Sequence, residues 1–180
     1  MRGFVLFVTE NGKDVSGGLC SIDGDTMFCH RGGVLDGNEE HVRNGAQSAL
    51  YLHRMHYAKD RQLRKLDLGH SRAFFRDGVY SYKRGWGASV SVDEDIEFWM
   101  YLFNPKNSVK AVAMLQQNPL IVHTVDGLIG NCICEKNDGY SESDINGLVH
   151  RKYALGLKGI RISSQTSKES SIISFEGIAH

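Results

Sequence analysis

Short runs of apolar and β-branched residues fill the start of the chain and predict strands. Residues 4–9 read FVLFVT, and Asn11-Gly12 follows as a hairpin turn signal. Residues 15–22 predict a second strand, and residues 26–30 predict a third after a turn at residues 23–25. The glycine pair Gly32-Gly33 then predicts a bulge or a bend in the third strand.

A helical period replaces the strand pattern after residue 37. The apolar and aromatic positions share one helical face from Asn38 to about Asp60, and they are Val42, Ala46, Ala49, Leu50, His53 and Tyr57. Glu39 and Glu40 suit the positive end of such a helix. Further along, the pattern predicts a short buried strand at residues 63–69, a helical turn within residues 71–83, and strands at residues 88–92 and 96–103.

The second half of the chain predicts further helices and strands. Residues 108–117 are helical and end before Pro119, and residues 120–135 form a hairpin around Asp126-Gly127. A helix capped by Ser143 and ended by Gly156 follows. A strand at residues 158–163 comes next, and the serine-rich residues 163–174 are expected to be a strand pair or a frayed end.

Composition narrows the cellular setting. The 180 residues carry 21 Lys and Arg against 21 Asp and Glu, so no net field favours DNA or an anionic membrane. No run of eighteen apolar residues predicts a membrane span, and the apolar part of the N-terminus is too short for a signal peptide. The four cysteines lack disulfide-style spacing, which favours a reducing compartment. These features predict a cytoplasmic protein.

One segment carries a family resemblance. Residues 58–88 contain Asp67-Leu68-Gly69 at a strand end, then Asp77-Gly78, then Tyr82-Lys83-Arg84-Gly85-Trp86-Gly87. This order of motifs resembles the FemAB group of acetyltransferase-like domains, a branch of the GNAT fold. The resemblance implies an α/β (α+β) fold with a mixed, mostly antiparallel sheet and helices on both faces. Residues 1–103 would form this core without the usual N-terminal strand and two helices, and residues 104–180 a C-terminal α/β extension packed on it.

The resemblance also implies a reaction. A GNAT-like enzyme moves an acyl group from a thioester to an amine or hydroxyl acceptor, and acyl-CoA or acetyl-CoA is the expected donor. Aminoacyl-tRNA or an acyl carrier protein are alternative donors, although the neutral charge disfavours tRNA. A non-catalytic GNAT-like module that binds a ligand or a partner protein is the alternative function. A homodimer in which a second chain completes the acceptor site is a further alternative.

Candidate site residues follow from the same resemblance. A pyrophosphate-binding turn would use Arg43, Gly45, Ala46, Gln47 and Ser48, through free backbone amides if the helix begins near Asn44. If the helix begins at Asn38, Gly45 lies inside it and binds nothing. Backbone amides near Val34 would stabilise an oxyanion.

Side chains for the chemistry itself come from the family-like segment and its flanks. Asp67 or His70 would act as the base, Tyr82 would protonate the thiolate, and Lys83 would hold donor phosphates. The pairs Cys132-x-Cys134 and His53-x-x-His56 lack the paired spacing of a structural zinc site, so no metal is expected.

Overall fold

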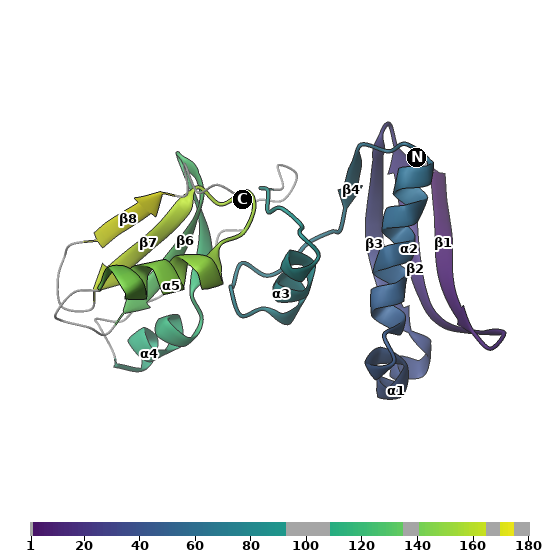
Figure 1. Cartoon of the computed structure of the whole chain (residues 1–180), viewed down its shortest axis with the longest axis horizontal. Coiled ribbons are helices and arrows are strands. Elements are labelled where there is room, and N and C mark those ends of the chain that lie inside the picture. The colour runs from purple at the N-terminus through teal and green to yellow at the C-terminus, as the bar shows by residue number, and fades with distance from the viewer. Residues whose placement is uncertain (1, 93–108, 135–140, 165–169, 175–180) are drawn as a thin grey trace. The chain divides into compact units, whose positions relative to one another are not determined.

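The computed structural model describes residues 2–92, 109–134, 141–164 and 170–174, and it confirms a mixed α/β protein (Figure 1). The chain divides into two compact units, which are Met1–His70 (unit 1) and Ser71–His180 (unit 2). Each unit has its own four-stranded mixed sheet. The domain boundary expected after residue 103 lies outside the described residues and stays a prediction.

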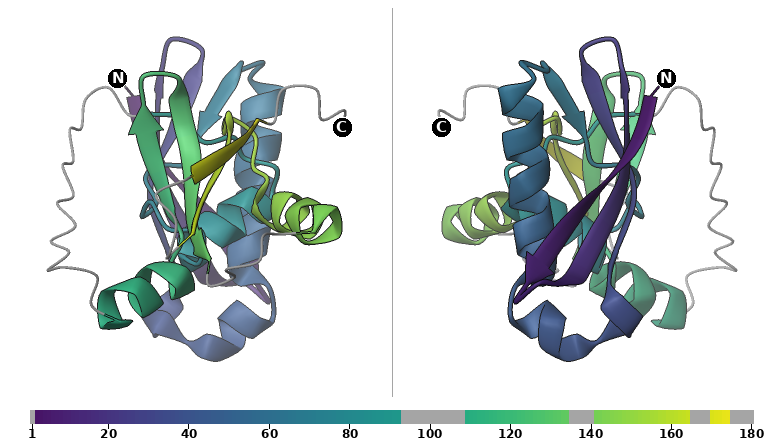
Figure 2. Two further views of the ribbon diagram at one scale, coloured as in Figure 1. Left: turned by 90° about the vertical axis from the view of Figure 1, so that its left-hand side faces the viewer. Right: turned by 90° about the vertical axis from the view of Figure 1, so that its right-hand side faces the viewer.

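Unit 1 is a three-stranded meander followed by a helical crossover. Its strands are β1 (Arg2–Glu10), β2 (Lys13–Asp23), β3 (Thr26–Val34) and β4 (Lys65–Asp67), in that order across the sheet. The first three strands pair antiparallel, and β4 pairs parallel with β3. The crossover consists of a 3-10 turn (Leu35–Gly37), α1 (Glu39–Arg43) and α2 (Ala46–Asp60). The right view of Figure 2 shows the β1–β2 hairpin and α2.

One extra residue in β3 sets which side chains enter the unit 1 core. Leu19 pairs with Arg31, but the next residue of β2, Cys20, pairs with Cys29, so His30 has no partner of its own. Because side chains alternate across a strand, this bulge changes the phase of β3. Cys29 and Gly32 therefore both face α2. The prediction placed a bulge or bend at Gly32-Gly33, but both glycines pair regularly with β2 and the bulge lies at His30.

Helix α2 covers one face of the unit 1 sheet. Its buried positions recur every four residues and include Ala46, Leu50, Arg54 and Ala58. The prediction placed His53 on this face, but His53 is exposed and the neighbouring Arg54 is buried. A helix continuous from Asn38 was also wrong, because Gly45 adopts φ 86° and separates α1 from α2. The predicted end at Asp60 is confirmed.

Unit 2 repeats the combination of a hairpin and a parallel crossover. Its helices are α3 (Gly78–Gly85), α4 (Val109–Gln117) and α5 (Glu142–Lys152), and its strands are β5 (Leu120–Thr124), β6 (Gly127–Cys134), β7 (Gly159–Ser164) and β8 (Ser170–Ser174). The sheet order is β5-β6-β7-β8, with only β6 and β7 parallel. The left view of Figure 2 shows the β5–β6 hairpin with α4 and α5.

The unit 2 core explains where several predicted boundaries moved. Its buried side chains are Phe75, Tyr80, Cys132, Ala154, Leu157, Ile160 and Ile162. Helix α5 ends at Lys152, short of the predicted Gly156, because Ala154 and Leu157 turn into this core.

The N-terminal cap of α5 also lies two residues earlier than predicted. Ser141 Oγ accepts a hydrogen bond from the Asp144 amide at 3.2 Å, so Ser141 caps the helix in place of the predicted Ser143. Residues 88–92 form no strand, since the Val90 amide instead bonds the Leu155 carbonyl. The predicted strand 96–103 lies outside the described residues. No described helix has the length and apolar character needed to cross a membrane.

Candidate functional site

The edge of β3 is open over half its length within unit 1. Strand β4 pairs only with Thr26–Phe28 and stops at Asp67, so β3 continues from Cys29 to Val34 without a β4 partner. The chain turns away at Gly69, which has φ 71°. A Cβ at Gly69 would lie 3.0 Å from the Cys29 carbonyl oxygen, so the turn sits at the start of this open edge. Residues 30–33 are exposed, and Val34 is half-buried.

The helix that follows this edge begins without a side-chain cap. Gly45 occupies the N-cap position of α2, and it has no side chain to accept hydrogen bonds from the first amides. Those amides belong to Ala46, Gln47 and Ser48, of which Ala46 is buried. Arg43 ends α1 and binds Glu39 at 2.9 Å on the exposed surface. The sequence allowed a helix that begins at Asn38 or one that begins near Asn44. The structure has a separate helix start at Gly45, which matches the second of these.

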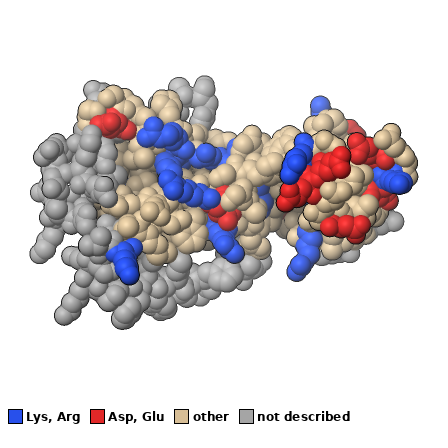
Figure 3. Space-filling model, turned by 90° about the horizontal axis from the view of Figure 1, so that it is seen from below, with Lys and Arg blue, Asp and Glu red and all other residues tan. Residues whose placement is uncertain are grey.

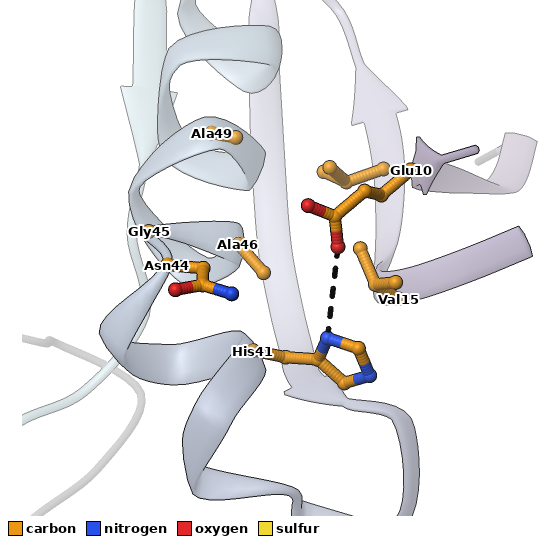
Figure 4. A pocket seen from close by; sticks show the side chains of 8 residues that line it. Glu10, Val15, His41, Asn44, Gly45, Ala46 and Ala49 are labelled. Atoms are coloured by element: carbon orange, nitrogen blue, oxygen red, sulfur yellow. Dashed lines mark ion pairs between the residues drawn. The ribbon is translucent and has the colours of Figure 1, made fainter.

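A small cavity lies beside this helix start (Figure 4). Its volume is about 100 Å³, and its lining is Val8, Glu10, Val15, His41, Asn44, Gly45, Ala46 and Ala49. Glu10 and His41 face each other across it, with 3.8 Å between Glu10 Oε2 and His41 Nδ1. Sites for drug-sized ligands are usually about 300–1,000 Å³. This cavity therefore has room for a small group and not for a whole nucleotide donor.

Arg54 is the one charged side chain that α2 buries against the described sheet of unit 1. Only 3% of Arg54 is exposed, and its Nη2 donates a hydrogen bond to the Arg31 carbonyl at 2.9 Å. A Cβ at Gly32 would lie 2.9 Å from the same nitrogen, and a Cβ at Gly18 would clash with it. The two glycines thus leave the space that the guanidinium occupies. Arg54 forms no ion pair with a described carboxylate, and its Nε has no described hydrogen-bond partner.

Two thiols lie near Arg54 in the same core. Cys20 and Cys29 are cross-strand partners, 0% and 5% exposed, and both are free cysteines. A hydrogen bond from Cys29 lowers the pKa of Cys20 to about 7, helped by the positive charge of Arg54 and opposed by burial. The same hydrogen bond, together with burial, raises the pKa of Cys29. The pair therefore shares one proton near neutral pH, with the negative charge on Cys20.

Asp67 and His70 lie at the end of β4 beside the open edge. Asp67 Oδ1 accepts a hydrogen bond from the Gly69 amide at 2.8 Å, and Asp67 Oδ2 lies 3.8 Å from Lys65 Nζ. Asp67 therefore holds the turn that carries the exposed His70. This places the carboxylate in a structural role and leaves its role as a base a prediction.

The two other predicted chemical residues belong to unit 2, on α3. Tyr82 is half-buried and packs edge-to-face on Trp86, with ring centroids 6.3 Å apart. Lys83 is 8% exposed, and its carbonyl accepts hydrogen bonds from the Trp86 and Ala88 amides. Asp77 caps the helix by accepting from the Tyr80 amide at 2.8 Å. The presence of Asp77-Gly78 in the family-like segment is thus explained locally, because the pair starts α3.

Positive charge gathers at the ends of α3 and α5 in unit 2. Arg84 Nη1 donates to the Arg151 carbonyl at 2.9 Å, and Lys152 Nζ lies 5.2 Å from the centre of the Phe75 ring. Burial and the charges of Arg76, Arg84 and Arg151 lower the pKa of Lys152, while Cys132 opposes them. Figure 3 shows Lys and Arg side chains concentrated on one face of this unit, whereas unit 1 mixes both signs. Cations at two helix C-termini also stabilise the helix dipoles.

Sequence reasoning missed Arg54 and the cysteine pair. Arg54 stands four residues from both Leu50 and Ala58, which are apolar and buried on one face of α2. An arginine at that spacing was the available signal that its side chain is buried. Gly18 and Gly32, which make room for it and each belong to a glycine pair, were the second signal. No local pattern shows that Cys20 meets Cys29, because that pairing depends on the bulge at His30.

Within the described segments, no group of three or more His, Cys, Asp or Glu side chains is arranged to hold a metal ion. Comparison with known proteins found no matching family model, no matching curated protein and no matching solved structure.

Proposed function

We propose that the chain is an acyltransferase, which moves an acyl group from a thioester donor, acyl-CoA in the first instance, to an amine or hydroxyl. The observation that carries the proposal is the junction of β3 and α2 in unit 1. Of the nine residues of β3, the six from Cys29 to Val34 have no β4 partner, and the next long helix begins at a glycine without a side-chain cap. Such a junction suits two kinds of group, which are an extended ligand that contains amides and a phosphate.

The open edge suits the extended arm of the donor. An unpaired strand offers backbone N–H and C=O groups, and an extended chain of amides can add to it as another strand would. The pantetheine arm of coenzyme A contains two such amides. Residues 30–33 are exposed along this edge, so the arm would reach the backbone without displacing a core side chain.

The start of α2 suits the donor's pyrophosphate. Free amides at a helix N-terminus bind anions, and the helix dipole adds to the attraction. Gly45 leaves open space, because a Cβ there would meet no atom within 4 Å. Glu39 is paired with Arg43, and the side chain of Asn38 accepts from the Glu40 amide at 2.9 Å. Arg43 thus offsets the negative charge of Glu39.

The turn at Asp67–His70 would supply the proton acceptor. The acceptor amine must lose a proton as it attacks the thioester carbonyl, and an imidazole titrates near neutral pH. Asp67 fixes the turn, which leaves His70 as the base in this proposal. Backbone amides of Gly32–Val34 would stabilise the oxyanion. Tyr82 and Lys83 belong to unit 2, and their roles as proton donor and phosphate ligand stay predictions from the family resemblance.

A thermal-shift titration with CoA, acetyl-CoA and a longer acyl-CoA tests the proposal. A ligand that binds only the folded state stabilises it by mass action and so raises the melting temperature. At a ligand concentration of a hundred times Kd, the gain in unfolding free energy is about 2.7 kcal/mol. We expect a saturable shift with all three ligands. A panel of amines and alcohols, with release of free CoA thiol as the readout, would then identify the acceptor class.

The control is a pair of substitutions at Gly45 that differ only in charge. Asp and Asn both tolerate positive φ and both can cap a helix, so Gly45→Asp and Gly45→Asn should both fold. The aspartate also brings a negative charge to the phosphate position. We expect the ligand-induced shift to vanish in Gly45→Asp and to persist, weakened, in Gly45→Asn. No shift with any of the three ligands in the unaltered protein would refute a CoA donor and favour the non-catalytic module.

A further inference from the structure

Arg54 needs a negatively charged partner that no described carboxylate provides. The side chain is 3% exposed, and a buried charge without compensation costs several kcal/mol. Its described hydrogen bond goes to a neutral group, the Arg31 carbonyl. The acidic groups beside it are the thiols of Cys20 and Cys29, which lie on the same face of the sheet under α2.

We propose that Cys20 and Cys29 are a modification site, a dithiol that a peroxide converts into a cross-strand disulfide, with Arg54 holding Cys20 in its thiolate form. The inference is independent of acyl transfer. Thiolates are the reactive form of cysteine, and they persist next to arginine. Redox-responsive cysteines also have a second cysteine close enough to resolve the first oxidation product.

The strand register fits the geometry of a disulfide. Directly opposed residues of an antiparallel pair have Cα atoms about 4.5–5.5 Å apart, and disulfides span about 4.4–6.8 Å. Cys20 and Cys29 are directly opposed because the bulge at His30 shifts the pairing by one residue.

The oxidation balances with one peroxide. The Cys20 thiolate attacks a peroxide oxygen, an S–O bond forms as the O–O bond breaks, and the departing hydroxide gains a proton and leaves as water. Cys29 then attacks the Cys20 sulfur, and its thiol proton joins the second hydroxide to make a second water. The two sulfurs lose two electrons, which reduce the peroxide to water. Because Cys20 is fully buried, the oxidant must reach it through a local opening that keeps Arg54 in place, and a reagent as small as hydrogen peroxide is favoured.

Peptide mapping of the full chain tests the site. After treatment with hydrogen peroxide, trypsin releases residues 14–31, which contain both Cys20 and Cys29, and residues 111–136, which contain Cys132 and Cys134. A disulfide within the first peptide appears as the loss of two hydrogen atoms. We expect it to form at least about tenfold faster than in the second peptide, whose Cys132 lies in the other unit. Equal rates in the two peptides would overturn the proposal.

Substitutions separate the roles. Cys29→Ser should block the disulfide and let a dimedone adduct accumulate on Cys20, whereas Cys132→Ser should change nothing in residues 14–31. Arg54→Leu should slow oxidation about tenfold, and Arg54→Lys should restore most of the rate. An unchanged rate in Arg54→Leu would refute the role of the arginine.

If Arg54→Leu fails to fold, the pH dependence of oxidation in the unaltered protein decides the question. A rate that reaches half its maximum near pH 7 supports the thiolate, and one near pH 9, the ordinary pKa of a cysteine, overturns it.

Discussion

The space beneath Arg54 gives a quantitative test of the unit 1 core. In Gly18→Ala, the new Cβ would clash with Arg54 Nη2 and would lie 2.9 Å from Arg54 Cζ. The guanidinium cannot move aside cheaply, since it is 3% exposed and bonded to the Arg31 carbonyl. Overpacking of this kind costs about 1–3 kcal/mol. We expect a loss of that size in the unfolding free energy of unit 1.

The matched control is Gly33→Ala. A Cβ at Gly33 meets no atom within 4 Å, and Gly33 does not adopt positive φ. The substitution should therefore change stability by less than about 0.5 kcal/mol, or raise it slightly by restricting the unfolded chain. Peptide-resolved hydrogen exchange across β2 and α2 measures the effect within unit 1 and leaves unit 2 out of the comparison.

A double-mutant cycle tests the cause. Arg54→Ala alone should destabilise unit 1, because it removes a packed side chain and the bond to the Arg31 carbonyl. In that background Gly18→Ala should cost less than about 0.5 kcal/mol, which gives a coupling of about 1–3 kcal/mol between the two positions. If Gly18→Ala is equally costly with and without Arg54, the clash with the guanidinium is not the reason that residue 18 is glycine.

Two further predictions concern titration and capping. The lowered pKa of Cys20 adds stability that is fully present above pH 9 and is lost as pH falls through about 7, by about 3 kcal/mol at most. The raised pKa of Cys29, to which the charge of Asp67 contributes, removes stability above pH 9. Urea unfolding should therefore show a maximum near pH 9 that Cys20→Ser flattens, and a flat profile in the unaltered protein would contradict the shared proton. In unit 2, Asp77→Ala should cost about 1 kcal/mol, since Asp77 caps α3, and Asp77→Asn should cost little. Equal losses in the two variants, measured by thermal unfolding, would argue against the cap.

Local signals predicted most of the secondary structure. Asn11-Gly12 and Asp126-Gly127 mark tight turns whose conformations few other residues adopt, so both hairpins were predicted close to their observed positions. The end of α2 at Asp60 follows from helical period alone. The sequence did not decide whether the helix is continuous through Gly45 or starts there. A glycine within a helical pattern either destabilises the helix or marks its boundary.

The site depends on relationships that no local pattern contains. Arg54 enters the core only because glycines on two other strands leave room for its guanidinium. Cys29 faces Cys20 only because His30 is an extra residue in β3. Whether the edge of β3 is open depends on where β4 stops, and a three-residue strand is too short for its end to be predicted from hydrophobicity.

The bulge at His30 also constrains how this sequence can vary in length. It divides β3 into two half-strands of opposite phase, one ending at Cys29 and the other beginning at Arg31. Deleting His30 would leave Cys29 directly beside Arg31, so the strand would alternate regularly and Cys29 and Gly32 would still share the face under α2. Relatives of this chain can therefore lack a residue at position 30 and keep the faces of both half-strands, but they would give up the 2.7 Å hydrogen bond between His30 and the buried Ser21.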